Sequence, residues 1–528
     1  MKKFLIPFML IIALVLVACS GDNTNSDINK SGGSDKPKEG GTVIVGLSGD
    51  PLDFNPNAKG DDDAYAIHQN IFNRLLKLNN NQEVLPDLAK EYEISKDGLE
   101  VTFHLQESVK WHDGEPFSSE DVKFTFDTII KENGQASGSL KAVKEITTPD
   151  ENTVVFHLDR KDSSLIGTLS WYGIFIMPKH IYEGTDWTTN PANHQPVGTG
   201  PFKFVEHDKG VSITLERNED YWGDVPLIDR VVFSIIPDAN TAIQALNNGE
   251  LDILGISPPF AEMEGFKNNP QLDYGEAVWP TRFQLAFNLK DKTFSDLKVR
   301  QAVAYGIDKQ EIIQKALKGI GEESTTAMVP AFKEALNTDD VFPGRDVEKA
   351  KQLLEEAGYK ADSEGIYFST KIDVFSGEPF EDIATVIREN LAEVGIDVSI
   401  NIMESAAWSD KVWDSKNYEM SLLAGYQGPG PGALVGRFTS EGSMNIYNYE
   451  NKKVDEALTN ATAQATLEES GPYYKEAQKY IVEDIPMLPL SEWISVQPYH
   501  NYIKGHPMSK EYIDKTGFTE FTYIWIDK

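Results

Sequence analysis

Cysteine is almost absent from this chain, since Cys19 is the only one among 528 residues. Disulfides and cysteine-based metal or redox centres are therefore excluded from the rest of the protein, because they need further thiolates. A chain of this length buries enough apolar surface to fold without disulfides. It is also too long for one hydrophobic core, so we expect two or three lobes.

Signature motifs of enzymes are also missing. The sequence contains no GxxxxGK[ST], no GxGxxG after a strand, no HExxH and no GxSxG. Its nine histidines are scattered without the spacing of metal ligands. We therefore expect no catalytic residue, no metal site and no cofactor. A lipid-anchored hydrolase stays open as an alternative, which incubation with candidate substrates would reveal.

Positive charge is scarce. Asp and Glu number 83 against 49 Lys and Arg, which gives a formal net charge of −34. Such a field repels phosphate backbones, so nucleic acid is excluded as a partner. The same field keeps a surface protein soluble and attracts cationic or zwitterionic solutes.

The N-terminus carries an apolar run from residue 4 to residue 17 after Lys2 and Lys3. The run is shorter than the roughly 20 apolar residues that span a bilayer. Its basic, apolar and small-residue zones predict a secretion signal that is removed. The sequence Leu16-Val17-Ala18-Cys19 resembles the bacterial lipobox. This resemblance implies cleavage after Ala18 and a lipid on Cys19; the alternative is an ordinary signal peptide with a chance cysteine.

Residues 1–18 are accordingly expected to be a signal peptide, and residues 19–40 a lipidated flexible tether. The tether is rich in Ser, Gly, Asn, Asp and Lys, and such a composition buries too little surface to fold. Several acyl chains hold a protein on a membrane firmly. We expect a protein anchored to the cell membrane on its extracytoplasmic face.

Order is predicted to begin at Gly41. The run 42–47 is typical of a buried strand, and Ile67 and Ile71 lie on one face of a predicted helix. A strand over 371–375, a helical stripe over 383–394 and alternating apolar residues over 396–402 indicate a β-α-β unit with a parallel sheet. The predicted fold class is α/β with at least two lobes.

A series of ordered motifs runs through the chain. They are LPDLA (85–89), DGLEVTFHL (97–105), VKWHDGEPF (109–117), SEDV (119–122), PVGTGPF (196–202), RNEDYWG (217–223), FN (287–288), DLKVRQAV (296–303) and KAKQLLEEAG (349–358). Together they resemble the extracellular solute-binding proteins of the oligopeptide, dipeptide and nickel ABC importers, bacterial solute-binding protein family 5. The similarity covers essentially Gly41 to the C-terminus.

The resemblance implies a two-lobed periplasmic-binding-protein fold of type II with an extra domain and a hinge. Lobe I would comprise residues 41–85, 197–287 and 493–528, the extra domain 86–196, and lobe II 288–492. The hinge would lie at Phe287, Asn288, Trp493 and Ile494, where the chain crosses between lobes. Backbone rotation during domain closure concentrates at such crossings.

The resemblance also implies the function. A monomer would capture an oligopeptide or dipeptide and deliver it to ABC permease subunits that a separate ATPase powers. The first alternative is the same transport role for a non-peptide solute, such as an oligosaccharide, an opine or a metal chelate. The second is a surface receptor or adhesin without a transport role.

The expected ligand contacts lie on loops and strands of both lobes. They are Asp50, Pro51, Leu52, Trp279, Arg282, Trp408, Tyr426, Gln427 and Gly428. In the peptide binders an aspartate after the lobe II strand pairs with the peptide ammonium, but here the loop 427–432 contains no carboxylate. A buried ammonium without a partner is costly. Either Asp50, Asp53 or Glu441 substitutes, or the ligand has no free N-terminus.

Overall fold

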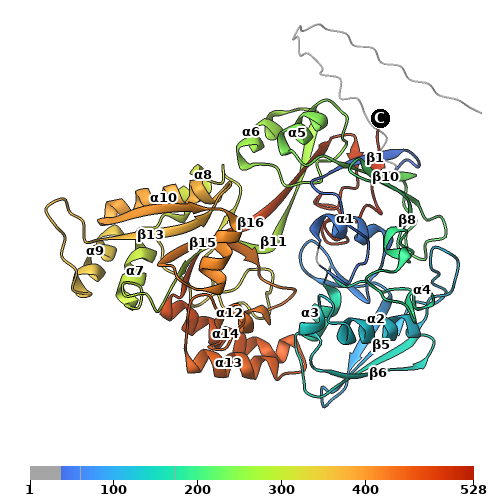
Figure 1. The fold of residues 1–528 in the computed structure, drawn as a ribbon, viewed down its shortest axis with the longest axis horizontal. Coiled ribbons are helices and arrows are strands. Elements are labelled where there is room, and N and C mark those ends of the chain that lie inside the picture. The colour runs from blue at the N-terminus through green and yellow to red at the C-terminus, as the bar shows by residue number, and fades with distance from the viewer. Residues whose placement is uncertain (1–36, 60, 172) are drawn as a thin grey trace, which may run out of the picture. The chain divides into compact units, whose positions relative to one another are not determined.

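The computed structural model describes residues 37–59, 61–171 and 173–528. The predicted signal peptide, Cys19 and residues 19–36 of the tether lie outside the described residues. The described chain contains both helices and strands throughout, in agreement with the α/β prediction (Figure 1).

The sheet of lobe I has the strand order β1-β10-β9-β8, in which β1 and β10 are parallel and the other pairs antiparallel. Apolar side chains on its inner face, such as Val43 and Phe233, pack against helix α1, which confirms the predicted strand 42–47 and the helix that follows. The elements are β1 (Thr42–Leu47), α1 (Asp62–Ile71), β8 (Phe202–Asp208), β9 (Ser212–Arg217), β10 (Arg230–Ile235), α5 (Ala239–Asn247), η3 (Phe260–Glu262) and α6 (Met263–Asn268).

The extra domain has its own core under an antiparallel sheet of order β4-β5-β7-β6. Helix α2 covers this sheet, with Phe126 against Phe156, and its N-cap residue Ser118 donates its backbone N–H to Asp121. The core already includes Leu75, before the predicted boundary at residue 86. The elements are β2 (Leu76–Leu78), β3 (Val84–Pro86), β4 (Ala89–Ile94), β5 (Glu100–Leu105), α2 (Ser119–Lys131), η1 (Ser137–Ser139), β6 (Val143–Asp150), β7 (Thr153–Leu158), α3 (Leu165–Ser170), α4 (Lys179–Tyr182) and η2 (Pro191–His194).

Lobe II is built on a mixed sheet of order β12-β16-β11-β15-β13-β14. Its strands are β11 (Leu272–Phe287), β12 (Glu322–Glu323), β13 (Phe368–Phe375), β14 (Ile396–Met403), β15 (Met420–Tyr426) and β16 (Met487–His500). Strands β13 and β14 are parallel and joined by α10 (Phe380–Val394), which is the predicted β-α-β unit. The other helices are α7 (Leu297–Gly306), α8 (Lys309–Lys315), α9 (Val347–Glu356), α11 (Ser405–Ser409), η4 (Asp410–Asp414), α12 (Ala433–Phe438), α13 (Lys452–Thr462) and α14 (Leu467–Asp484).

Two long strands, β11 and β16, join the lobes. They pair antiparallel along their length, and Figure 1 shows them running together from lobe II toward β1. Near lobe I, Tyr499 bridges to Ile253, which bridges to Val45 of β1. The pairing register shifts between Val278 and Arg282, and Trp493 lies opposite this shift. The crossing between the lobes therefore lies within β11.

The crossing on β11 lies before Phe287 and Asn288, two of the four residues predicted to form the hinge. Phe287 pairs with Met420 and stacks on Phe294 inside the core of lobe II, and Asn288 donates to the carbonyl of Tyr418. Strand β11 continues from one lobe into the other, and its side chains enter the core of lobe II from Phe283 onward. Phe287 and Asn288 therefore lie inside lobe II, beyond the point where the chain crosses.

The C-terminal segment after β16 returns to lobe I. Its short strands β17 (Ile503–Lys504) and β18 (Trp525–Ile526) pair with each other, and Phe521 and Ile524 enter the core of lobe I. This segment brings residues 516–521 beside α1, where they help to form the cavity described next.

Candidate functional site

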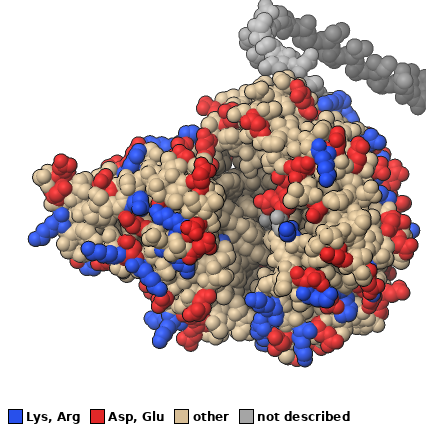
Figure 2. All heavy atoms as spheres, viewed as in Figure 1, with Lys and Arg blue, Asp and Glu red and all other residues tan. Residues whose placement is uncertain are grey.

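A cavity of about 550 Å³, here called cavity A, opens where α1, the crossing strands and the C-terminal segment meet. Figure 2 shows the surface hollowed between lobe II on the left and lobe I with the extra domain on the right. The polar and aromatic residues that line cavity A include Ser48, Asp62, Asp63, Gln69, Trp279, Thr281, Trp493, Ser495, Phe518 and Thr519. Segments far apart in the sequence therefore form a single wall.

Trp279 is the centre of an aromatic row beside cavity A. Its ring lies 5.6 Å from that of Phe518 in an edge-on contact and 6.3 Å from that of Tyr426 at the end of β15. Such a row offers a large apolar surface with defined geometry to a ligand. Of the predicted contact residues, Trp279 lines cavity A and Tyr426 lies next to it.

The charged residues of cavity A are carboxylates from the first turn of α1. Asp61 caps the helix by accepting the N–H of Ala64 at 3.1 Å, which leaves Asp62 and Asp63 to face the cavity. Asp63 also accepts the hydroxyl of Ser48 at 2.8 Å. Partial burial, followed by the negative charges of Asp61 and Asp63, raises the pKa of Asp62. A cationic group in the cavity would relieve this repulsion.

Asp62 and Asp63 are not among the ligand contacts predicted from the sequence. The sequence contains one indication of this role. A helix uses one capping side chain, at the residue before its first turn, so a run of three acids leaves two carboxylates that do not cap the helix. Phe518 and Thr519 had no such signal, because their contact with α1 joins residues at opposite ends of the chain.

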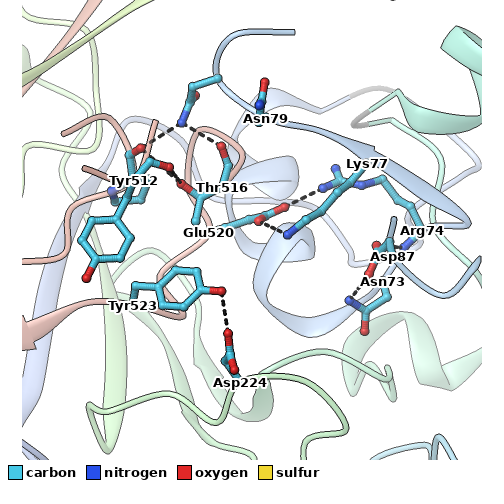
Figure 3. A network of polar contacts seen from close by, with 12 residues as sticks. Asn73, Arg74, Lys77, Asn79, Asp87, Asp224, Tyr512, Thr516, Glu520 and Tyr523 are labelled. Carbon is cyan, nitrogen blue, oxygen red and sulfur yellow. Dashed lines mark hydrogen bonds and ion pairs between the residues drawn. The ribbon is translucent and has the colours of Figure 1, made fainter. Parts of the chain in front are cut away.

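A polar network holds the C-terminal segment in place (Figure 3). The carboxylate of Glu520 accepts bonds of 2.8 Å from both Arg74 and Lys77. Burial alone would raise the pKa of Glu520, but the charges of Lys77 and Arg74 outweigh it and lower that pKa. Next to it, the hydroxyl of Thr519 accepts a bond of 2.9 Å from Gln69 on α1. The network thus fixes the position of a wall of cavity A.

A second cavity of about 460 Å³, cavity B, adjoins cavity A. Trp493, Ala239 and Ser257 line both cavities. The ring of Trp493 packs against Phe260 of lobe I at 6.0 Å and Phe283 of β11 at 5.1 Å. Trp493 is therefore a wall between the two cavities at the crossing strands.

A third cavity of about 890 Å³, cavity C, lies between the extra domain and lobe II. The loop without a carboxylate reaches it through Pro429 and Gly430, and Asp162 of the extra domain lies on the opposite side. Gln427 is buried and donates its backbone N–H to Pro280 at 2.6 Å. Gly428 has a φ of +89°, a conformation that disfavours other residues. These two residues shape the turn between Tyr426 and cavity C.

The comparisons with known proteins agree with this arrangement. Residues 83–445 match the family model described as bacterial extracellular solute-binding proteins, family 5. The chain belongs to this family. Members are transport components and not enzymes, and the two-lobed α/β prediction is confirmed by the solved structures of the family.

Individual relatives cover nearly the whole chain. The oligopeptide-binding protein AppA of Bacillus subtilis is 29% identical over 512 residues, 91% of each chain. The substrate-binding protein CtaP of Listeria monocytogenes, from an ABC transporter, superposes with a TM-score of 0.84 at 26% identity, covering 93% of this chain and 100% of CtaP. AppA of B. subtilis in complex with a nonapeptide gives a TM-score of 0.73 at 26% identity, covering 93% and 100%.

Other predicted contacts of this family 5 protein lie away from the cavities. Asp50 accepts a bond of 2.6 Å from His207 and another from the N–H of Gly210. Pro51 is buried, whereas the side chain of Leu52 is 85% exposed. None of the three lines cavities A to C in the described structure, because the turn points toward β8. Their role as cleft walls stays a prediction.

Arg282 and Trp408 are placed in the core of lobe II. Arg282 is fully buried and donates to the carbonyls of Thr326, at 2.7 Å, and Ala327. Trp408 is 7% exposed and donates to the hydroxyl of Ser421 at 3.0 Å. Their polar atoms bind the protein itself, so the structure assigns both to lobe II packing instead of ligand contact.

The remaining acids proposed for an ammonium partner also lie elsewhere. Asp53 accepts the backbone N–H of Asn55, and Glu441 lines none of cavities A to C among the described residues. Over the same part of the chain, no cluster of three or more possible metal ligands occurs. No described helix is both long and apolar enough to cross a membrane.

Proposed function

We propose that this protein is the lipid-anchored substrate-binding component of an ABC importer that takes up peptides. The observation that carries the proposal is cavity A, whose wall combines α1, both crossing strands and the C-terminal segment. A ligand there contacts the strands that join the lobes, so its binding energy is available to close them. The peptide complex of AppA supports the ligand class.

Within cavity A, Asp62 and Asp63 would pair with the peptide ammonium in place of the missing loop carboxylate. The aromatic surface of Trp279 would pack against the first side chains. The part of β11 before Thr281, which β15 does not pair, would bond the peptide backbone, as in the addition of a strand to a sheet. The loaded, closed form would then dock on permease subunits, and a separate ATPase would drive import.

Mass spectrometry of the solute that co-purifies with the protein tests the ligand class. A mixture of short peptides is expected. An oligosaccharide, an opine or a metal chelate would instead move the protein to the non-peptide branch of the transport role. Binding of a cell-wall polymer without any small solute would favour a surface receptor.

Calorimetry with matched free and N-acetylated peptides tests the ammonium contact. Because Asp62 is partly exposed, acetylation is expected to weaken binding by roughly two- to five-fold. Asp62→Asn should reduce this difference and the double variant with Asp63→Asn should remove it, whereas Asp186→Asn, at an exposed position of the extra domain, should leave it unchanged. Equal binding of both peptides to the unchanged protein would contradict the assignment.

The anchor is tested separately. Cys19→Ser should release the protein into the medium or leave it unprocessed, because the acceptor sulfur is gone. A processed Cys19→Ser protein that stays in the membrane fraction would refute the lipid anchor.

A further inference from the structure

Cavity B has apolar walls. They come from Phe260 and Met263 of lobe I, Ile320 of lobe II, and Ile494 and Val496 of β16. The cavity volume, about 460 Å³, is sufficient for a long side chain. Apolar walls of this kind favour the methylene groups of a ligand, since each buried CH₂ contributes about 0.8 kcal/mol.

The rim of cavity B is acidic. Glu262, at the end of η3 in lobe I, and Glu378, before α10 in lobe II, line it from opposite lobes. Neither carboxylate has a hydrogen-bond or ion-pair partner among the described residues. Among those residues, no Lys, Arg or His lines cavity B or cavity A. The two lobes thus present like charges to each other across cavity B.

Lysine and arginine side chains match this arrangement. Their methylene stems cover apolar surface while the charged head stays at the solvent edge. In cavity B the stem would lie against Phe260 and Met263, and the head would reach Glu262 and Glu378. The head would then neutralise two carboxylates that otherwise repel. An acidic side chain would meet like charge, and a purely apolar one would leave the repulsion in place.

We propose that cavity B is a subsite for a lysine or arginine side chain of the bound ligand. The proposal rests on the proposed peptide function. Trp493 lines both cavities, so a peptide that begins in cavity A passes this ring before a later side chain enters cavity B. Since Glu262 and Glu378 come from different lobes, the cationic head also bridges them.

The test is a positional scan by calorimetry on the intact protein. Pentapeptides of alanine carry lysine, norleucine or glutamate at one position at a time; norleucine keeps the apolar stem and lacks the charge. At one position the peptide with lysine is expected to bind more tightly than the peptide with norleucine, by roughly two- to five-fold in Kd for each carboxylate. Glutamate should bind weakest there. The lysine advantage should shrink as salt is raised, because the head and the carboxylates are near solvent.

Variants assign the effect to cavity B. Glu262→Gln and Glu378→Gln should each reduce the lysine advantage, and the double variant should abolish it while the norleucine peptide still binds. Glu264→Gln is the matched control, since Glu264 is an exposed acid two residues from Glu262 that does not line the cavity.

The outcomes separate the two proposals. Peptides that bind without a lysine advantage at any position, or an advantage that survives the double variant, overturn the subsite and leave the peptide function standing. If no peptide binds, both proposals fail.

Discussion

Asp87 is a buried acid at the junction of lobe I and the extra domain. Its carboxylate accepts bonds from the side chain of Asn73 at 2.8 Å and the N–H of Arg74 at 2.6 Å (Figure 3). Burial raises its pKa to about 6, and the nearby positive charges of Lys77 and Arg74 offset the effect only in part. The ionised form of Asp87 therefore lowers the stability of the folded state relative to the protonated form.

The consequence is a pH dependence of stability. The folded-state pKa lies above the ordinary value of 3.8, so the folded protein binds a proton more tightly than the unfolded chain. The contribution of Asp87 is fully present below about pH 4 and is lost as the pH rises to about 6, a change on the order of 3 kcal/mol. Urea unfolding between pH 4 and pH 7 measures it, and Asp87→Asn should remove this part of the slope. The same slope in Asp87→Asn would contradict the assignment.

Single residues were predicted from the sequence to different degrees. Trp279 was expected beside the ligand and lines cavity A. Arg282, three positions later on the same strand, was expected there as well but lies buried among carbonyls. The register shift between Val278 and Arg282 separates the two environments. Pro280 in this stretch marks an irregular strand, but it does not indicate which neighbouring side chains turn into the core. Contacts of individual side chains therefore needed the structure.

At the scale of elements, local patterns were sufficient for many boundaries. The strand 42–47 and the β-α-β unit around α10 follow from an apolar run, a helical stripe and alternating apolar residues. The C-terminal segment did not follow from local patterns, because its anchors are long-range: Glu520 binds Arg74 and Lys77 from the other end of the chain. Periodicity describes neighbours in sequence and carries no information on such pairs.

This anchor predicts a large effect of one substitution. Glu520→Gln leaves the buried guanidinium of Arg74 without its ion-pair partner, so the free energy of unfolding should fall by about 3–5 kcal/mol. Denaturant unfolding measures the loss. Glu132→Gln is the control, because Glu132 forms an exposed pair with Lys131 and should change stability by less than about 0.5 kcal/mol. Similar stability of the two variants would show that the network adds little.

At the scale of the whole molecule, two antiparallel strands carry the connection between the lobes described here. Trp493 lies opposite the register shift of β11 and also faces cavities A and B. A solute bound as proposed in cavity A or B would therefore contact the same short stretch of backbone that would rotate when the lobes approach. A hinge at Trp493 and Ile494 stays a prediction. On the other crossing strand, β11, we expect the hinge at residues 278–282 instead of at Phe287, because the pairing register shifts there.

Closure on the ligand is the test of that geometry. A peptide that binds should reduce the radius of gyration in solution scattering, because residues of both lobes line cavity B and the strands that join the lobes line cavity A. It should also stabilise the folded state by about 2.7 kcal/mol at a hundredfold excess over Kd, which raises the Tm. Trp279→Ala is the matched control: loss of the aromatic row should weaken binding, so the same peptide concentration should produce a smaller change in both measurements. If a peptide raises the Tm and leaves the scattering profile unchanged, the lobes do not close, and the role assigned to the 278–282 and 493–494 crossing is incorrect.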